Sequence, residues 1–520
     1  MNKLIAAILC AALLGASGSD VPAQVDRTIA AVLAKPIYAH STFGLFVADQ
    51  ATGETLVDRN ANAMFGTGSI MKVYAATAAL KAYGPDYRFR TPVYRTGNAS
   101  GGVLNGNLVL VASGDFSFGL RDRPDGTLAF NSFPQLDHNY ADTGFPGAAL
   151  VPDSRPLSAL DELARKIRAG GIRSVRGDVV IDDRLFSTYK GWPDGLIAPI
   201  WVNENVIDIT STPTRAGEPA KLDWRPKTGA ISVVSTVKTV AAGTKTPPLS
   251  VKTIAAGKVQ VSGEIAADAK PLIVISQVPH PADFARVAFI EALRRAGVAV
   301  TASASGTNPV RLLPNPNVYA ARTMVAQHVS PPLSQYVKVV LKISYNRGAD
   351  LLVCLVAAKI GSSDCADGLA AEVKTIAPLG ASAVSTIVYD GAGSVDDGRT
   401  TPSDEATLLR NLMSVPWGHY VHDGMSILGV DGTQATSEVG TPAAGKVRIK
   451  DGTRLIGSPS GQAYIPAKTQ VGYIEAKSGR KLVYGIFFNG VPTTEASAFA
   501  DVMTANDDEG AIVAAIQSSY

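Results

Sequence analysis

Hydrophobic positions near the start of the chain follow two different periods. Residues 41–49 and 54–58 read as two strands on either side of a short Thr-Gly turn, which predicts a β-hairpin. Residues 25–33 and 69–80 instead repeat apolar side chains at helical spacing. The pattern therefore predicts a helix, a hairpin and a second helix in this order, which fits a sheet flanked by helices.

The middle of the chain is dominated by short strands and turns. A polar stretch rich in Gly, Pro and Asn, residues 116–156, is expected to form surface loops. Residues 221–278 alternate short apolar runs with Gly and Pro turns, which predicts an all-β insert. Helices are predicted at residues 157–169 and 282–296.

The C-terminal part returns to long helices and contains the strongest strand signals of the chain. The predicted helices are residues 349–359, 402–413 and 501–518, and the predicted strands are residues 386–389, 446–450, 470–474 and 481–489. Several adjacent strands close to a C-terminal helix favour an α+β fold in which helices cover an antiparallel sheet.

Length and composition narrow the class of protein. At 520 residues the chain exceeds what one hydrophobic core usually supports, so we expect two or three domains. A hydrophobic fraction of 46% with 18% charged residues indicates a globular rather than a disordered chain. The net charge of +3 and the lack of a basic run argue against a nucleic-acid partner. Six scattered histidines show no metal-ligand spacing, so neither a metal nor a cofactor is expected.

The N-terminus has the features of a signal peptide. Lys3 precedes an apolar run, residues 4–14, and Val21-Pro22-Ala23 offers small residues for cleavage near Ala23. The run is too short to span a bilayer, and no later stretch reaches the roughly 18 apolar residues of a membrane helix. We therefore expect an exported, soluble protein with no integral membrane segment.

The three cysteines fall into two groups. Cys10 follows Leu9, where a lipoprotein signal requires a small residue, so no lipid anchor is expected. Cys354 and Cys365 remain after signal cleavage, and in an oxidising compartment they could form a disulfide. The alternative is that Cys354 is only a small buried hydrophobic residue.

Ser69 and Lys72 open the second predicted helix as a Ser-x-x-Lys pair. Helix positions i and i+3 share one face, so Lys72 can reach the hydroxyl of Ser69. A serine hydroxyl is a poor nucleophile until a base takes its proton, and lysine can be that base when burial and nearby cations lower its pKa. An isolated pair of this kind arises often by chance and is equally compatible with a helix cap beside a solvated lysine.

Two further motifs make a chance occurrence much less plausible. Ser344-Tyr345-Asn346 and Lys450-Asp451-Gly452 follow in the chain, matching S-x-N and an altered K-T-G. Other matching stretches are residues 84–89, 114–115, 330–333, 390–393 and 428–433. With these motifs the chain resembles the low-molecular-mass class C penicillin-binding proteins, the D-alanyl-D-alanine carboxypeptidases/endopeptidases of the penicillin-binding protein 4 type.

The resemblance implies a serine D,D-peptidase of the bacterial periplasm that cleaves peptidoglycan stem peptides and is acylated by β-lactam antibiotics. Ser69 would attack the D-Ala carbonyl and form an acyl-enzyme, with Lys72 as general base. Ser344 would relay a proton to the leaving amine, and Asn346 would hold the substrate amide and Lys72. The resemblance requires no cofactor and leaves the oligomeric state open.

The third motif would bind the substrate. Lys450 would supply positive charge beside the relay serine and the substrate carboxylate, with Gly452 and Thr453 on the same strand. The backbone N–H groups of Ser69 and Thr453 would form the oxyanion hole.

Asp451 departs from the family pattern, which has Thr at this position. Its carboxylate is expected to repel the terminal carboxylate of a substrate, and so to weaken carboxypeptidase relative to endopeptidase activity. Thr453 and Arg454 follow and could compensate, and Lys468-Thr469-Gln470 is a weaker candidate for the same motif.

The gap between Lys72 and Ser344 is long enough for a complete domain. We therefore expect a β-lactamase/transpeptidase-like domain, an antiparallel sheet flanked by helices, that is split by a large β-rich insertion of one or two domains. The expected division is a signal peptide at 1–23, the catalytic domain at 24–92 and 313–520, and the insertion at 93–312, with a β-rich subdomain at about 215–278.

Two other functions remain open from the sequence. The same motifs could serve a D-amino-amide or ester hydrolase or a β-lactamase-like enzyme; the long insertion argues against a plain β-lactamase, whereas Asp451 favours such a variant. A catalytically weak wall-binding protein is the third possibility, and the intact Ser69 and Lys72 argue against it.

Overall fold

The computed structural model describes residues 21–143, 147–191, 195–316, 319, 323–395 and 397–520. The predicted signal peptide, apart from its last three residues, lies outside the described residues, and helix α1 begins at Ala23. Within the described residues, none of the helices combines the length and apolarity needed to cross a lipid bilayer.

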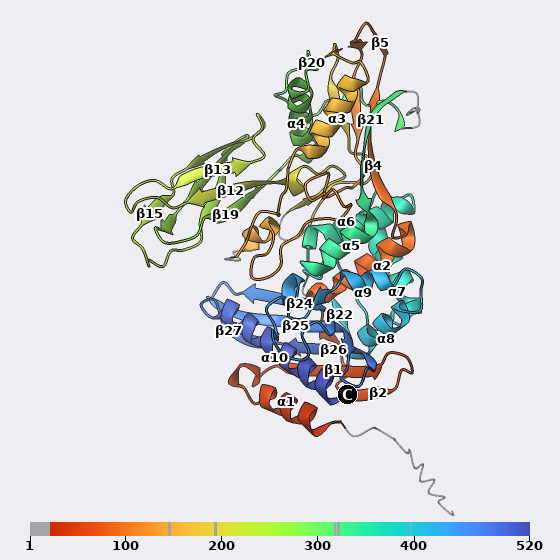
Figure 1. Ribbon diagram of the computed structural model, residues 1–520, viewed down its shortest axis with the longest axis vertical. Coiled ribbons are helices and arrows are strands. Elements are labelled where there is room, and N and C mark those ends of the chain that lie inside the picture. Colours follow the sequence, from red (N-terminus) through yellow and green to blue (C-terminus); the bar gives the residue numbers. More distant parts are fainter. Residues whose placement is uncertain (1–20, 144–146, 192–194, 317–318, 320–322, 396) are drawn as a thin grey trace, which may run out of the picture.

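Among the described residues, seven strands form one antiparallel sheet in the lower half of the molecule (Figure 1). The order is β2-β1-β26-β25-β24-β23, and β27 pairs with β25. Its strands are β1 (Thr42–Asp49), β2 (Thr55–Arg59), β23 (Ser426–Ile427), β24 (Val447–Gly457), β25 (Gln462–Glu475), β26 (Lys481–Asn489) and β27 (Val491–Thr494). Because β1 pairs with β26 along its whole length, the two ends of the chain share one sheet.

The two faces of this sheet are covered by different helices. Successive strand residues point to opposite faces. Tyr484 and Ile486 of β26 therefore pack with α1 (Ala23–Leu33) and α10 (Ala498–Ser519). Val483 and Phe487 pack into the other core, on the side of the central helices.

The central helices are built around α2, which is buried from Lys72 to Leu80. Its alanine-rich sequence has no large polar face, as expected for a helix enclosed by other helices. The group comprises α2 (Lys72–Tyr83), α5 (Leu333–Lys342), α6 (Asn346–Lys359), α7 (Cys365–Ile376), α8 (Pro402–Leu412) and α9 (His419–Gly424). Cys354 of α6 and Cys365 at the start of α7 form a disulfide, so of the two possibilities for Cys354 the structure contains the disulfide.

The part between α2 and α5 forms the upper half of the molecule (Figure 1). β4 and β21 are antiparallel partners, so the chain leaves and re-enters the central helices side by side. The main elements here are β4 (Arg88–Arg95), β7 (Leu108–Val111), β9 (Val179–Asp182) and β21 (Met324–Pro332), with β5 (Asn98–Ser100), β6 (Val103–Asn105), β8 (Ser174–Val175) and β20 (Ala299–Val300) in a second sheet. Helices α3 (Ser158–Ala169) and α4 (Pro281–Arg295) share their core.

A β-rich lobe projects from this upper half (Figure 1). The predicted all-β segment is confirmed. It consists of β12 (Val206–Thr212), β13 (Lys221–Arg225), β14 (Ser232–Ser235), β15 (Lys238–Val240), β16 (Ser250–Ala255), β17 (Lys258–Ser262), β18 (Glu264–Ala266) and β19 (Leu272–Gln277). β12 and β19 pair with each other and connect the lobe to the rest of the chain.

The prediction of surface loops at residues 116–156 is wrong for much of that stretch. Phe116 and Phe118 are buried, and so are the polar residues Arg121 and Asp137. Arg121 contacts both Asp137 and Glu204 in ion pairs that are shielded from solvent. Part of the polar composition thus reflects a buried charge network, because buried charges are tolerated when they are paired. Arg123 and Asp125 of the same stretch are exposed.

The strand predicted at residues 386–389 is also absent from the structure. Ile387 makes a single β-bridge with Arg399, and Tyr389 is exposed. Directly afterwards the carboxylate of Asp390 accepts hydrogen bonds from the backbone N–H groups of Ala392 and Gly393, which turns the chain before a ladder can extend.

Candidate active site

Ser69 lies in a 3-10 turn, η2 (Gly68–Met71), directly before α2. The sequence places Ser69 at the start of the helix, and the structure refines this to the turn that leads into it. Gly68 has a φ of +54°, and a Cβ there would lie 3.0 Å from the backbone nitrogen of Thr453. Glycine is thus required both by backbone conformation and by the close approach of β24.

Lys72 is fully buried at the first position of α2. Its Nζ lies 2.6 Å from Ser69 Oγ and donates to the backbone oxygen of Ala392 at 2.8 Å. Burial lowers the pKa of Lys72 well below its ordinary value, and the positive charge of Lys450 lowers it further. A lysine in this state is available as the neutral amine that can accept the serine proton.

Ser344 and Asn346 occupy the junction between α5 and α6. Ser344 has a φ of +56°, which is uncommon for a residue with a side chain and is often found at functional sites. Tyr140, from the inserted part of the chain, fixes this junction, because its hydroxyl donates to the backbone oxygens of Ile343 and Ser344 at 2.6 and 2.8 Å. Ser344 and Asn346 both line the cleft that contains Ser69.

Strand β24 carries the third motif along the edge of the same cleft. A Cβ at Gly452 would lie 2.6 Å from the backbone oxygen of Thr67 and 2.9 Å from the backbone nitrogen of Ser69, so only glycine fits. Lys450 is buried next to Asp451, with its Nζ 3.4 Å from Asp451 Oδ1 and in contact with the Asp451 backbone oxygen. Burial lowers the pKa of Lys450 as well.

The carboxylate of Asp451 has a second partner besides Lys450. Thr433 Oγ1 donates to its Oδ1 at 2.6 Å. Burial raises the pKa of Asp451, but the charges of Lys450 and Lys468 outweigh it and bring the value to about 2. Asp451 is therefore a fixed negative charge at neutral pH.

The cleft has a volume of about 540 Å³ and brings the three motifs together. The rest of its lining includes residues from regions that the motifs do not indicate. They are Phe133, Leu136 and Tyr140 of the inserted part and Phe499, Val502 and Met503 of α10. Nothing in the sequence pattern of residues 133–140, which were expected to be surface loops, indicated this role.

The turn at residues 390–394 positions Lys72 through the backbone oxygen of Ala392. Asp350 of α6 accepts from the backbone N–H of Gly391 at 3.0 Å, while Asp390 accepts from Gly393 at 2.5 Å. Together these carboxylates fix the segment that presents the Ala392 oxygen to Lys72. Sequence reasoning missed Asp350, although an acidic residue inside the strongly apolar stretch 349–359 was an available signal.

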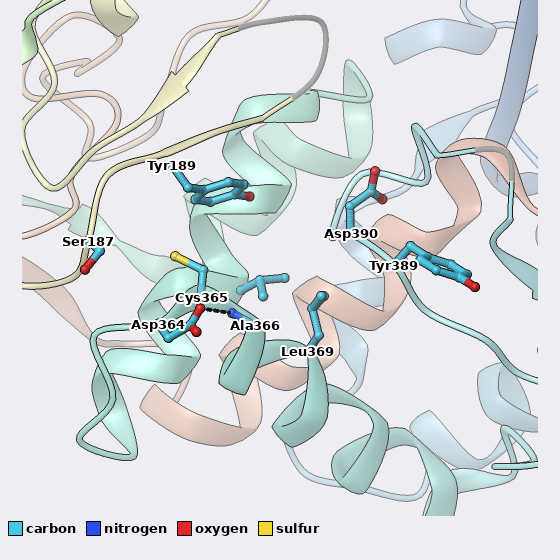
Figure 2. A pocket seen from close by; sticks show the side chains of 10 residues that line it. Ser187, Tyr189, Asp364, Cys365, Ala366, Leu369, Tyr389 and Asp390 are labelled. Atoms are coloured by element: carbon cyan, nitrogen blue, oxygen red, sulfur yellow. Dashed lines mark hydrogen bonds between the residues drawn. The ribbon is translucent and has the colours of Figure 1, made fainter.

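A second cavity of about 490 Å³ has Asp390 and Gly391 of this turn in its lining (Figure 2). Figure 2 shows Tyr189 and Asp390 on opposite sides of the cavity, with Cys365 and Leu369 of α7 below them.

Burial raises the pKa of Asp350 well above its usual range, and the charge of Asp390 raises it further. Among the described residues, no group of His, Cys, Asp and Glu is arranged to hold a metal ion.

The class of protein follows from this geometry together with comparisons to known proteins. A serine and a lysine at the start of a buried helix, next to a strand of an antiparallel sheet, are the arrangement of the penicillin-binding, transpeptidase-like α+β fold. The solved structure of penicillin binding protein 4 (DacB) from Haemophilus influenzae superposes with a TM-score of 0.65 at 21% identity, covering 90% of this chain and 96% of that one. The predicted fold class is confirmed.

The family model for the D-Ala-D-Ala carboxypeptidase 3 (S13) family matches residues 25–509, and the chain belongs to this family. It is therefore a serine-type peptidase. The D-alanyl-D-alanine carboxypeptidase of Actinomadura sp. (strain R39) is 27% identical over 478 residues, which is 88% of this chain and 80% of the relative. The D-alanyl-D-alanine carboxypeptidase DacB of Haemophilus influenzae is 24% identical over 415 residues, covering 76% and 75%.

Proposed function

We propose that this peptidase cleaves D-Ala-D-Ala bonds and related cross-links in peptidoglycan stem peptides through an acyl-enzyme on Ser69. The observation that carries the proposal is the 2.6 Å separation of Lys72 Nζ and Ser69 Oγ around a fully buried lysine. A buried amine with a lowered pKa can remove the serine proton at the moment of attack.

The proposed reaction has two steps. Neutral Lys72 takes the hydroxyl proton while Ser69 Oγ bonds to the carbonyl carbon, and the backbone N–H groups of Ser69 and Thr453 receive the oxyanion. The carbon–nitrogen bond then breaks, and the proton passes through Ser344 to the leaving amine. Water completes the cycle by hydrolysing the ester, which restores the Ser69 hydroxyl.

The remaining motif residues would bind the substrate. Asn346 and Thr453 line the cleft and can bond to the peptide. Lys450 is buried next to Asp451 on the same strand, and its role would be to place positive charge near the leaving residue. Gly452 lets the neighbouring chain approach Ser69 closely. The expectation that Asp451 favours endopeptidase over carboxypeptidase activity stays a prediction, which a cross-linked dimer and a free pentapeptide would compare.

The proposed setting is the periplasm, reached after cleavage of a signal peptide near Ala23. This rests on the charged, apolar and small-residue segments at the N-terminus. β-Lactam antibiotics are the proposed inhibitors, in line with the penicillin binding protein 4 of Haemophilus influenzae, whose structure has been solved in complex with a novel β-lactam.

Intact-mass spectrometry of the mature protein with a penicillin tests the proposal. The wild type should gain the mass of one penicillin, and Ser69→Ala should gain none, because the bond forms at Ser69 Oγ. Ser458→Ala, at an exposed turn, is the matched control and should be labelled like the wild type.

Three outcomes would contradict the proposal. Equal labelling of Ser69→Ala would exclude Ser69 as the nucleophile. A wild type that neither forms an adduct nor consumes penicillin would support the wall-binding alternative, whereas consumption without an adduct would indicate a β-lactamase-like enzyme.

A further inference from the structure

The side chain of Asp451 presents a hydrogen-bond acceptor to the active-site cleft. It keeps 15% of its surface exposed and lines the same cleft as Ser69. The contacts with Thr433 and Lys450 are both made to Oδ1, at 2.6 and 3.4 Å. Among the described residues Oδ2 has no hydrogen-bond partner, so it remains for a ligand bound along β24.

The buried lysines at this end of the cleft are already neutralised by acids of the protein. Lys450 is in contact with Asp451, and Lys468 pairs with Glu509 at 2.5 Å, with both side chains buried. Lys468 lies directly across from Thr453 on the neighbouring strand and lines the cleft. A carboxylate placed here would thus meet two lysines that are already paired with acids, and it would lie beside the Asp451 carboxylate itself.

The geometry points to a neutral donor–acceptor group as the natural partner of this strand. Asp451 and Thr453 lie two residues apart on β24, both lining the cleft, so that they share one face. A carboxamide offers N–H donors to Asp451 and an oxygen that can accept from the Thr453 hydroxyl. A carboxylate has only acceptors, and an ammonium group would be placed beside the Lys450 charge.

We propose that the preferred substrates carry a carboxamide instead of a free carboxylate on the residue that leaves, with Asp451 as the specificity-determining residue. This inference rests on the proposed function, since it names the substrate class of the same site. In acylation, the Ser69 Oγ–carbon bond forms and the peptide carbon–nitrogen bond breaks. The amide-capped residue leaves as its free amine with the proton taken from Ser69, and its carboxamide stays intact.

A matched peptide pair tests the proposal. The two peptides end in the same acyl-D-Ala-D-Ala sequence, one as the free acid and one as the terminal amide. We expect the wild type to have a kcat/KM about tenfold or more higher for the amide, because one like-charge contact costs at least a tenfold factor in a partly buried site.

Asp451→Thr should reverse the preference in favour of the acid, because it removes the repelling charge. Asp451→Asn, which keeps the shape and can donate to a carboxylate, should move the ratio in the same direction. Glu475→Gln removes an exposed acid at the far end of β25 and should keep the wild-type ratio. A wild type that cleaves the acid as fast as or faster than the amide would overturn the inference.

A control substrate separates failure of this inference from failure of the proposed function. It is a thioester of the same acyl donor whose leaving thiol carries neither a carboxylate nor a carboxamide. Turnover of the thioester by the wild type and not by Ser69→Ala shows that the acylation machinery works, so the acid–amide ratio then decides the inference. No Ser69-dependent turnover of the thioester or of either peptide would overturn both the proposed function and the inference.

Discussion

Lys72 is surrounded by charges of both signs, and their balance sets the pH at which it becomes a base. Burial and Lys450 lower its pKa, while Asp390, Asp350 and Asp451 raise it. Opposite and like charges act in opposite directions on the protonated form of an amine. The acylation rate should therefore rise with pH as Lys72 loses its proton.

Two substitutions should move this rise in opposite directions. Lys450→Gln removes a like charge, raises the pKa of Lys72 and shifts the midpoint of the acylation rate to higher pH by roughly one unit. Asp390→Asn removes an opposite charge and shifts it to lower pH by a similar amount, while the amide oxygen can still accept from the turn. Stopped-flow measurement of penicillin acylation between acidic and alkaline pH gives both midpoints.

The midpoint is the readout, because Lys450 also contributes to binding and its loss changes the absolute rate. Glu475→Gln, far along β25, should leave the midpoint in place. Midpoints that move in the same direction for Lys450→Gln and Asp390→Asn would show that another group controls the rise.

Individual site residues differ in how far the sequence predicts them. Ser69 and Lys72 are three residues apart, so local helix geometry suffices to bring them together. Asp350 and Thr433 contribute through contacts with Gly391 and Asp451 that depend on the folded chain. No local pattern identifies such residues, and the roles assigned to Ser344, Asn346 and Lys450 stay predictions until they are tested.

At the scale of elements, the site depends on how closely β24 approaches the turn η2. Gly452 lies against Thr67 and Ser69 with no space for a side chain, and the Thr469 hydroxyl of β25 donates to the Thr67 oxygen at 2.6 Å. The distance between strand and turn thus sets the positions of the two proposed oxyanion donors.

Gly452→Ala should therefore reduce penicillin acylation by roughly 100-fold, the usual cost of a displaced oxyanion donor. Gly457→Ala on the same strand is the matched control, since the nearest atom to its added Cβ is Glu495 Oε1 at 3.7 Å. Acylation kinetics and thermal melting of both variants separate a local displacement from a general loss of stability. Equal kinetics for the two variants would contradict the close-approach argument.

The extent of the strands was the least predictable feature of these elements. The sequence predicts strands at 446–450 and 470–474, whereas β24 and β25 continue to Gly457 and begin at Gln462. The extension of β25 is stabilised by pairing with β27, where Ala463 faces Thr493. Strand ends are set by such partners, and a single stretch of sequence does not contain them.

At the scale of the whole molecule, we propose that residues 93–312 form the inserted part between catalytic segments 24–92 and 313–520, with a separable lobe at about 215–278. None of the described residues of this lobe lines the cleft. The lobe joins the rest of the chain through β12 and β19, in which Ser211 and Leu272 are direct partners.

Replacing residues 212–271 with Asn-Gly should close β12 and β19 into a hairpin, because this dipeptide favours a two-residue turn. Penicillin acylation should stay within about twofold of the wild type, since distant sites couple by less than about 0.5 kcal/mol. Loss of acylation in a variant that melts cooperatively would show that the lobe supports the catalytic part and is not separable.

The general architecture was predictable because three motifs and the strand patterns agree on it. The path of residues 116–156 was not, because some of its polar residues, such as Arg121 and His138, are buried by partners far along the chain. Arg121 contacts Glu204, and His138 lies 2.6 Å from Asp208. Charge pairing over such separations is invisible to any local hydrophobic pattern.

The pairing of β1 with β26 has a consequence for timing during synthesis. Thr42 faces Asn489, so the N-terminal hairpin lacks its inner neighbour until nearly the whole chain has been made. At translation rates of about 5–20 residues per second, this interval after Ser69 lasts roughly 20–80 s. β24 and β25 also come late in the chain, so for most of this interval Ser69 has neither strand beside it and the active site is incomplete.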